Sequence, residues 1–302
     1  MTALSLAALA VLLSVAAPVA LARARALHRA PRAAVVLWQA GALAAVLAAV
    51  AAALAAPEEI WRAVRGEQGA RDAWLLVAAS VAALTAGTIV LRLAVTTLRL
   101  GVVLRRRRRR QRDALDLLGA VDDDAARLHV LSGTVPLAYC VPGRPARVVV
   151  TEMVLQVLDE AETRAVVEHE RAHLRARHDL VLEAFTALHV AFPRVVRSRL
   201  ALDAVSTLLE MLADDIAAQR TGPGPLRRAL RALEPKAEGH EVALRRARLE
   251  DVYPDDGPRG HARAVAAGAY LTGAAVLAVP TVALVTPWLR AAVSALTGTP
   301  SE

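Results

Sequence analysis

The chain has little cysteine and few aromatic side chains. Of its 302 residues, one is a cysteine, Cys140, and 3% are aromatic. Because a disulfide needs two cysteines, a disulfide-stapled secreted scaffold is excluded. No segment recurs at a fixed period. By contrast, 56% of the residues are hydrophobic and the mean hydropathy is +0.39. This apolar content excludes a disordered chain and indicates an integral membrane protein with a soluble part.

Four long stretches contain almost no charge. A helix of roughly 20 apolar residues spans the ~30 Å core of a bilayer. The stretches of this length are Met1–Ala22, Ala33–Ala56, Ala73–Leu91 with its extension to Leu104, and Ala264–Leu289. The first lacks the basic start of a cleavable signal peptide, and arginines follow it, so we expect a retained span. The sequence therefore predicts four transmembrane helices.

Arginine is concentrated beside these stretches. The segment Arg23–Arg32 carries four arginines and no acidic residue, and Arg105–Arg110 is an uninterrupted run of six. The positive-inside rule places both segments in the cytoplasm, at the plasma membrane. The run has no interleaved aromatics and directly follows a span. Contact with anionic lipid therefore explains it better than direct nucleic-acid binding, which we do not expect.

The sequence predicts a mainly α membrane protein in three parts. Residues 1–104 hold three transmembrane helices, residues 105–263 a cytoplasmic α+β domain, and residues 264–302 the fourth helix and a short outer tail. In the middle part, short strands are expected at Leu128–Leu131, Val135–Cys140 and Arg147–Thr151. Helices are expected after Asp159, over Leu180–Phe192 and over Asp203–Arg220.

The helix after Asp159 carries the pattern His169-Glu170-Arg171-Ala172-His173. Residues four apart share a helix face, so both imidazoles can bind one metal ion. Zinc accepts imidazole nitrogen in tetrahedral geometry, and Glu170 is placed to act as a general base towards a water molecule. We expect one zinc ion held by His169 and His173, with Glu170 as the catalytic base.

A catalytic zinc site needs a third protein ligand. Glu183 and Glu210 are the two candidates downstream. Asp214 lies one helical turn after Glu210 and can accept the remaining ring N–H of a ligand histidine. Glu183 has no such acidic companion, and we therefore favour Glu210 as ligand, with Asp214 behind it.

The segments His169–Asp179 and Glu210–Asp214, between the third and fourth spans, resemble the BlaR/MecR-type membrane zinc metallopeptidases. These are gluzincins, like the Ste24 and HtpX peptidases. The resemblance implies His169, His173 and Glu210 as ligands and Glu170 as base. BlaR/MecR receptors continue past the fourth span into an extracellular penicillin-binding domain. This chain ends about a dozen residues after Leu289. We therefore expect the peptidase without the extracellular sensor domain.

The resemblance also leaves several roles open. His240, with Arg245 and Arg246, lies where Ste24-like enzymes stabilise the oxyanion, although a solvated helix face is the alternative. The strand Val135–Cys140 is either a substrate-binding edge or a core strand. His178 and Asp179 either orient a ligand or cap a helix where it bends.

The expected function is cleavage of a cytoplasmic protein or peptide, either a transcriptional repressor or the chain itself. The alternatives are Ste24/HtpX-like quality control of membrane proteins and a non-catalytic zinc-binding scaffold. The lipid bilayer is the other expected partner. Self-association into a homo-oligomer stays open.

Overall fold

A computed structural model describes residues 3–64, 69–118, 128–193, 198–233, 240–252 and 260–297. The described chain is mainly helical. Its first part comprises α1 (Ala3–Val11), a π-helical turn (Leu12–Ala16), α2 (Ala17–Arg23), a 3-10 turn (Arg25–Arg29), α3 (Pro31–Val64) and α4 (Gly69–Leu118). The sheet and its helices are β1 (Leu128–Leu131), β2 (Ala138–Val141), β3 (Arg147–Thr151), α5 (Glu152–Val157), α6 (Glu160–Ala176), α7 (His178–Ala191), α8 (Ser198–Thr221), α9 (Pro223–Leu233) and α10 (His240–Val252). The last helix is α11 (Gly260–Thr297).

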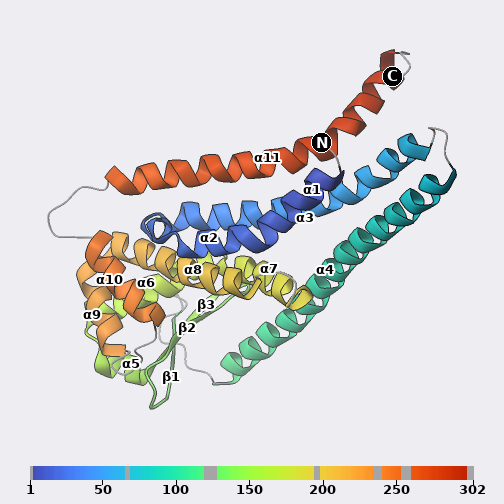
Figure 1. Cartoon of the computed structure of the whole chain (residues 1–302). Helices are drawn as coiled ribbons and strands as arrows, with labels where there is room; N and C mark the ends of the chain where they lie inside the picture. Colours follow the sequence, from blue (N-terminus) through green and yellow to red (C-terminus); the bar gives the residue numbers. More distant parts are fainter. Residues whose placement is uncertain are drawn as a thin grey trace.

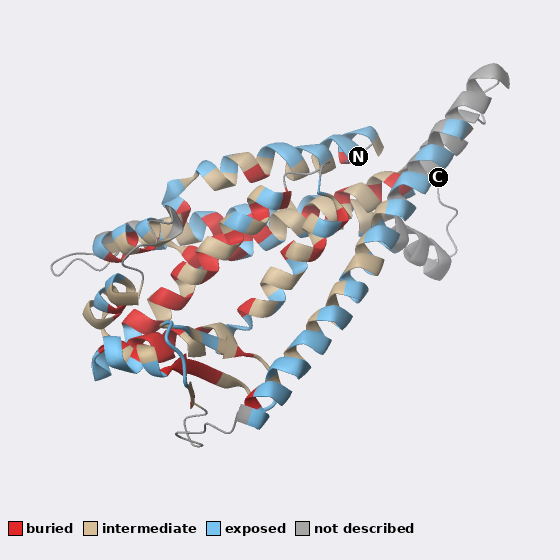
Figure 2. Cartoon of the chain, turned by 90° about the horizontal axis from the view of Figure 1, so that it is seen from below, coloured by how far each residue is buried: buried red, intermediate tan, exposed pale blue. Residues whose placement is uncertain are grey.

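Within the described residues, four segments are long and apolar enough to cross a membrane. They are Ala3–Arg23, Pro31–Ala55, Gly87–Leu117 and Ala262–Thr286. Helices α1, α3 and α11 run side by side, whereas α4 leaves the far end of α3 and extends to the sheet (Figure 1). Because α4 is one continuous helix, the expected domain boundary at 104/105 falls inside it. Buried residues concentrate in the bundle and beside the sheet, while α4 is largely exposed (Figure 2).

The sheet in the described chain has the strand order β1-β3-β2. β1 pairs with β3 in parallel, and β2 pairs with β3 antiparallel. β1 and β3 form at the expected residues. The second strand along the chain, β2, is shorter than the expected Val135–Cys140, because it begins at Ala138. The preceding segment is nevertheless attached to β3, because Leu137 N donates to Thr151 Oγ1 and Thr151 N donates to Leu137 O, both at 3.0 Å.

Three hydrophobic clusters position the helices around the sheet. Valines of β3 pack against Val166 and Val167 of α6. Ala165 of α6 joins α8, α9 and α10 through small and branched side chains. The largest cluster packs α7 and α8 against the start of α3, where Trp38 is 3% exposed. Helix α8 therefore lies between the candidate membrane helices and α6.

Candidate metal centre

Helix α6 brings the paired histidines together. It begins with a capping box, in which Glu162 N donates to Asp159 Oδ1 at 2.7 Å and Asp159 N donates to Glu162 Oε2 at 3.1 Å. These bonds satisfy backbone donors that the first helical turn leaves free. Nine residues of regular helix separate Asp159 from His169. Because His173 follows four residues later, both imidazoles lie on one face of α6, the face that meets α8. The Nε2 atoms of His169 and His173 are 3.2 Å apart.

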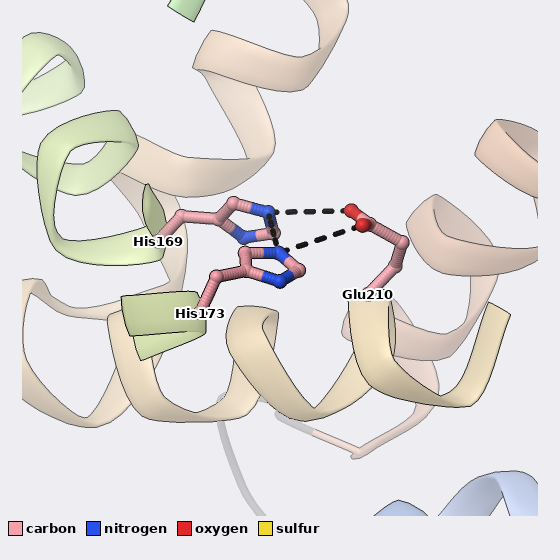
Figure 3. A group of neighbouring side chains, drawn as sticks. All are labelled: His169, His173 and Glu210. Atoms are coloured by element: carbon pink, nitrogen blue, oxygen red, sulfur yellow. Dashed lines mark hydrogen bonds and ion pairs between the residues drawn. The ribbon is translucent and has the colours of Figure 1, made fainter. Parts of the chain in front are cut away.

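Helix α8 supplies a carboxylate to the same point. Glu210 Oε2 lies 3.3 Å from His169 Nε2, and Glu210 Oε1 lies 3.4 Å from His173 Nε2 (Figure 3). Across the described part of the chain, these three residues form the group of histidine, cysteine and acidic side chains that could hold a metal ion. Their ligand atoms all lie within 4.8 Å of one another. Residues 41 positions apart in sequence thus converge on one site.

The donor set and its spacing fit zinc. Two imidazole nitrogens and a carboxylate oxygen are ligands that zinc binds at roughly 2.0–2.2 Å. In tetrahedral geometry, donors at that distance are separated by about 3.3–3.6 Å. The observed separations of 3.2, 3.3 and 3.4 Å lie in this range or about 0.1 Å below it. Three protein ligands leave the fourth tetrahedral position open, which is typical of catalytic zinc sites.

A buried ion pair lies behind the candidate ligands. Asp214 Oδ1 is 3.0 Å from His169 Nδ1, on the side of the ring away from Glu210. Arg245 of α10 donates from Nε to Asp214 Oδ2 and from Nη2 to Asp214 Oδ1, both at 2.8 Å. Its Nη1 lies 3.1 Å from Glu210 Oε2. Arg245 therefore holds both carboxylates, and Asp214 in turn orients the His169 ring.

These contacts keep the acids ionised. Burial opposes the charge of Glu210, but the neighbouring His169 and Arg245 outweigh it and lower the pKa of Glu210 to about 2. The pKa of Asp214 is also lowered, because Arg245 and His169 outweigh its burial. For His169 burial disfavours the cation, yet Asp214 and Glu210 raise its pKa to about 9, so a metal ion that binds this ring would displace a proton from it. Burial lowers the pKa of His173 to about 4, so this ring is neutral at pH 7 and can offer a nitrogen lone pair.

Glu170 directly follows the first of the paired histidines on α6. Its side chain interacts with the thiol of Cys140 on β2, and burial raises the pKa of Glu170. A carboxylate with a raised pKa accepts a proton more readily than an exposed one, as a general base must. Burial and the nearby Glu170 together raise the pKa of Cys140 to about 12. The thiol is therefore a neutral neighbour of Glu170.

The other expected site residues have different positions. Glu183, the alternative ligand, binds Arg108 of α4, which also lies 3.1 Å from Asp179. His240 is the first residue of α10, but its side chain lies outside the described residues. Arg245 contacts carboxylates, a role that the sequence did not indicate. The signal that could have found it is the predicted position of Asp214 behind a ligand histidine, because a carboxylate buried there requires a cation; the structure has Asp214 fully buried.

Comparison with known families gives one match. Residues 103–207 match Peptidase family M48, which indicates a metallopeptidase domain. The match covers about a third of the chain and includes His169, Glu170 and His173. It ends before Glu210 and Asp214, so these two residues rest on the geometry alone. Comparisons with curated proteins and with solved structures give no match.

Proposed function

We propose that the protein is a membrane-embedded zinc endopeptidase. The observation that carries this proposal is the convergence of His169, His173 and Glu210 at the separations of tetrahedral zinc ligands. The family match and the position of Glu170 next to these ligands support it. Zinc, when bound, acts as a Lewis acid that polarises the scissile carbonyl and lowers the pKa of a water molecule.

The protein groups complete the hydrolysis. The carboxylate of Glu170 takes a proton from the attacking water, whose oxygen forms the new bond to the carbonyl carbon. Glu170 then returns that proton to the amine nitrogen as the C–N bond breaks. Arg245 and Asp214 hold Glu210 and His169 in place during this step. Preorganisation of this kind avoids the cost of reorienting the groups during the reaction.

The β2 edge is the proposed binding surface for the substrate backbone. Among the described strands, β2 pairs with β3 on one side only. An extended peptide can add to such an edge by main-chain hydrogen bonds. Because Cys140 of β2 interacts with Glu170, a peptide on this edge would pass beside the base.

The substrate proposed is a cytoplasmic protein. Arg248 of α10 donates from Nε to His28 O in the arginine-rich turn Arg25–Arg29. The peptidase helices and this turn therefore lie on one side of the candidate spans, and the positive-inside rule makes that side cytoplasmic. By resemblance, the target is a transcriptional repressor or the chain itself. Quality control of membrane proteins uses the same chemistry and is the second candidate.

A zinc-binding scaffold without activity is disfavoured by the coordination. Structural zinc is closed by four protein ligands. Asp214 is a further acid beside the group, but its oxygens face His169 Nδ1 and Arg245 instead of the point shared by the three ligands.

The variant Glu170→Gln tests the proposed function. It retains the ligands but cannot accept a proton, so we expect wild-type zinc content and loss of proteolysis by at least about 100-fold. Zinc is measured by elemental analysis of the purified full chain. Proteolysis is measured as new protein N-termini in cells that express each variant.

Glu160→Gln is the matched control, because Glu160 is in the first turn of the same helix and pairs with Arg164 at the surface. It should retain both zinc and proteolysis. Undiminished cleavage by Glu170→Gln would exclude Glu170 as the base, and absence of zinc from the wild-type protein would refute the metal site.

A further inference from the structure

His178 lies directly behind one of the paired histidines. Helix α6 ends at Ala176, and Arg177 adopts the left-handed conformation with φ 51°. This turn starts α7 immediately, so that the His178 side chain returns towards α6. Its Nδ1 lies 3.0 Å from Nδ1 of His173, and the two rings meet edge to face.

The direction of this hydrogen bond follows from the metal site. A histidine that binds metal through Nε2 carries its proton on Nδ1. The Nδ1–H of His173 must therefore donate, and the Nδ1 of His178 must accept. A neutral imidazole with its proton on Nε2 is the form of His178 that can do this.

We propose that His178 is a positioning residue for His173, accepting the Nδ1–H of that ring and so directing its Nε2 to the metal. This inference rests on the proposed function, because it presupposes a metal at the site. The two ligand histidines then have different supports. His169 is held by the carboxylate of Asp214, whereas His173 is held by a neutral imidazole.

The burial of His178 supports this role. The residue is 2% exposed, and within the described residues its Nε2 has no hydrogen-bond partner. A buried donor without a partner costs free energy, so a purely apolar side chain would fill this space at lower cost. An apolar residue at position 178 would, however, lose the hydrogen bond with His173. The presence of a polar ring at this buried position is therefore explained by the hydrogen bond that Nδ1 of His178 accepts from His173.

Zinc affinity of the full-length protein tests the proposal, measured by competition with a chromophoric chelator. Loss of a partner that orients a ligand typically weakens metal binding by about 10–100-fold, and we expect this loss for His178→Ala. His178→Asn is the informative second variant, because the amide Oδ1 of asparagine is two bonds from Cβ, as Nδ1 is in histidine. It should recover most of the affinity.

His189→Ala is the matched control. His189 lies near the other end of α7 and contacts Ser198 Oγ at 3.0 Å, so its loss should leave zinc affinity unchanged. Wild-type affinity in His178→Ala would overturn the proposal. So would an equal loss in the alanine and asparagine variants, since a packing defect would then explain both. If the wild-type chain bound no zinc, the proposed function would fail together with this inference.

Discussion

Asp214 is a carboxylate that the interior holds in its ionised form. It is fully buried, and two hydrogen bonds from Arg245 and the proximity of His169 compensate its charge. Arg245 also contacts Glu210, so a single guanidinium links the proposed ligand to the residue behind the other ligand. Removal of such a cation leaves a charge in the interior without compensation.

Arg245→Ala should therefore destabilise the protein strongly. Breaking one side of a buried ion pair costs about 3–5 kcal/mol. Unfolding of the purified chain in detergent measures this loss. The control is Arg231→Ala, which breaks the exposed pair with Glu250 and should cost less than about 1 kcal/mol. Equal effects of the two variants would contradict the importance of the buried pair.

Cys140 is expected to be an unreactive thiol. Burial and Glu170 raise its pKa from 9.0 to about 12. The reactive thiolate is then about 1,000-fold scarcer at neutral pH than for an ordinary cysteine. The alkylation rate of Cys140 should still rise about tenfold per pH unit near pH 10, whereas the alkylation rate of an ordinary cysteine has levelled off at that pH.

The variant Glu170→Gln separates charge from access in this experiment. It removes the negative charge that raises the thiol pKa, so alkylation should become faster at pH 8. A rate that is slow, independent of pH and unchanged by the variant would mean that the thiol is simply inaccessible. Mass spectrometry of the alkylated chain provides the measurement.

At the scale of elements, α6 has two functions at once. One face carries the paired histidines, and another face packs Val166 and Val167 onto the sheet. Its start is set by the capping box and its end by the left-handed Arg177. A non-glycine residue in that conformation is uncommon, and here it is the single residue between the end of α6 and the start of α7.

Asp159→Ala should shorten or loosen the start of α6. Loss of a side-chain cap costs typically about 1 kcal/mol, because backbone N–H groups of the first turn lose their acceptor. Thermal unfolding measures the effect. Asp203→Ala in α8 is the control, since it breaks only an exposed pair with Arg199 and should cost less than about 0.5 kcal/mol. A cap that is unimportant would give the two variants equal stability.

At the scale of the whole molecule, the candidate metal centre is attached to the candidate membrane spans. Helix α8 carries Glu210 and packs against the start of α3 through the largest hydrophobic cluster. Arg248 of α10 adds a link, because it contacts Met211 O, Asp215 and His28 O. A shift of the spans relative to one another would therefore be transmitted to α8.

The proposed cytoplasmic orientation of the peptidase helices can be tested with single cysteines in a Cys140→Ser background. In the sequence, Gln68 stands between the second and third predicted spans, and Leu155 lies on α5 with a side chain that is 40% exposed; each is replaced by cysteine. The arginine distribution predicts that the first faces outward and the second inward. An impermeant maleimide on intact cells should label position 68 and spare position 155, and both positions should react after lysis. The reverse pattern would place the peptidase helices outside.

The local pattern of residues determined much of this protein before any contact was known. Hydropathy indicated four candidate spans, because a bilayer accepts only long apolar helices. The third one differs in its bounds: the sequence predicts it at Ala73–Leu91 with its extension to Leu104, and the structure has the candidate segment at Gly87–Leu117. The capping box of α6 and the strands β1 and β3 follow from short-range preferences, and the structure has them at the expected residues. The pairing of His169 with His173 follows from helical periodicity, which needs no tertiary information.

Only the tertiary structure decided what surrounds those two histidines. It selected Glu210 over Glu183 as their neighbour, because α8 packs on α6 whereas Glu183 faces Arg108 of α4. It paired Arg245 with Asp214, and it returned His178 to His173 through the turn at Arg177. Local sequence encodes which residues share a helix face. Which faces meet depends on how apolar surface is buried between elements distant in the chain, and a single sequence does not reveal that.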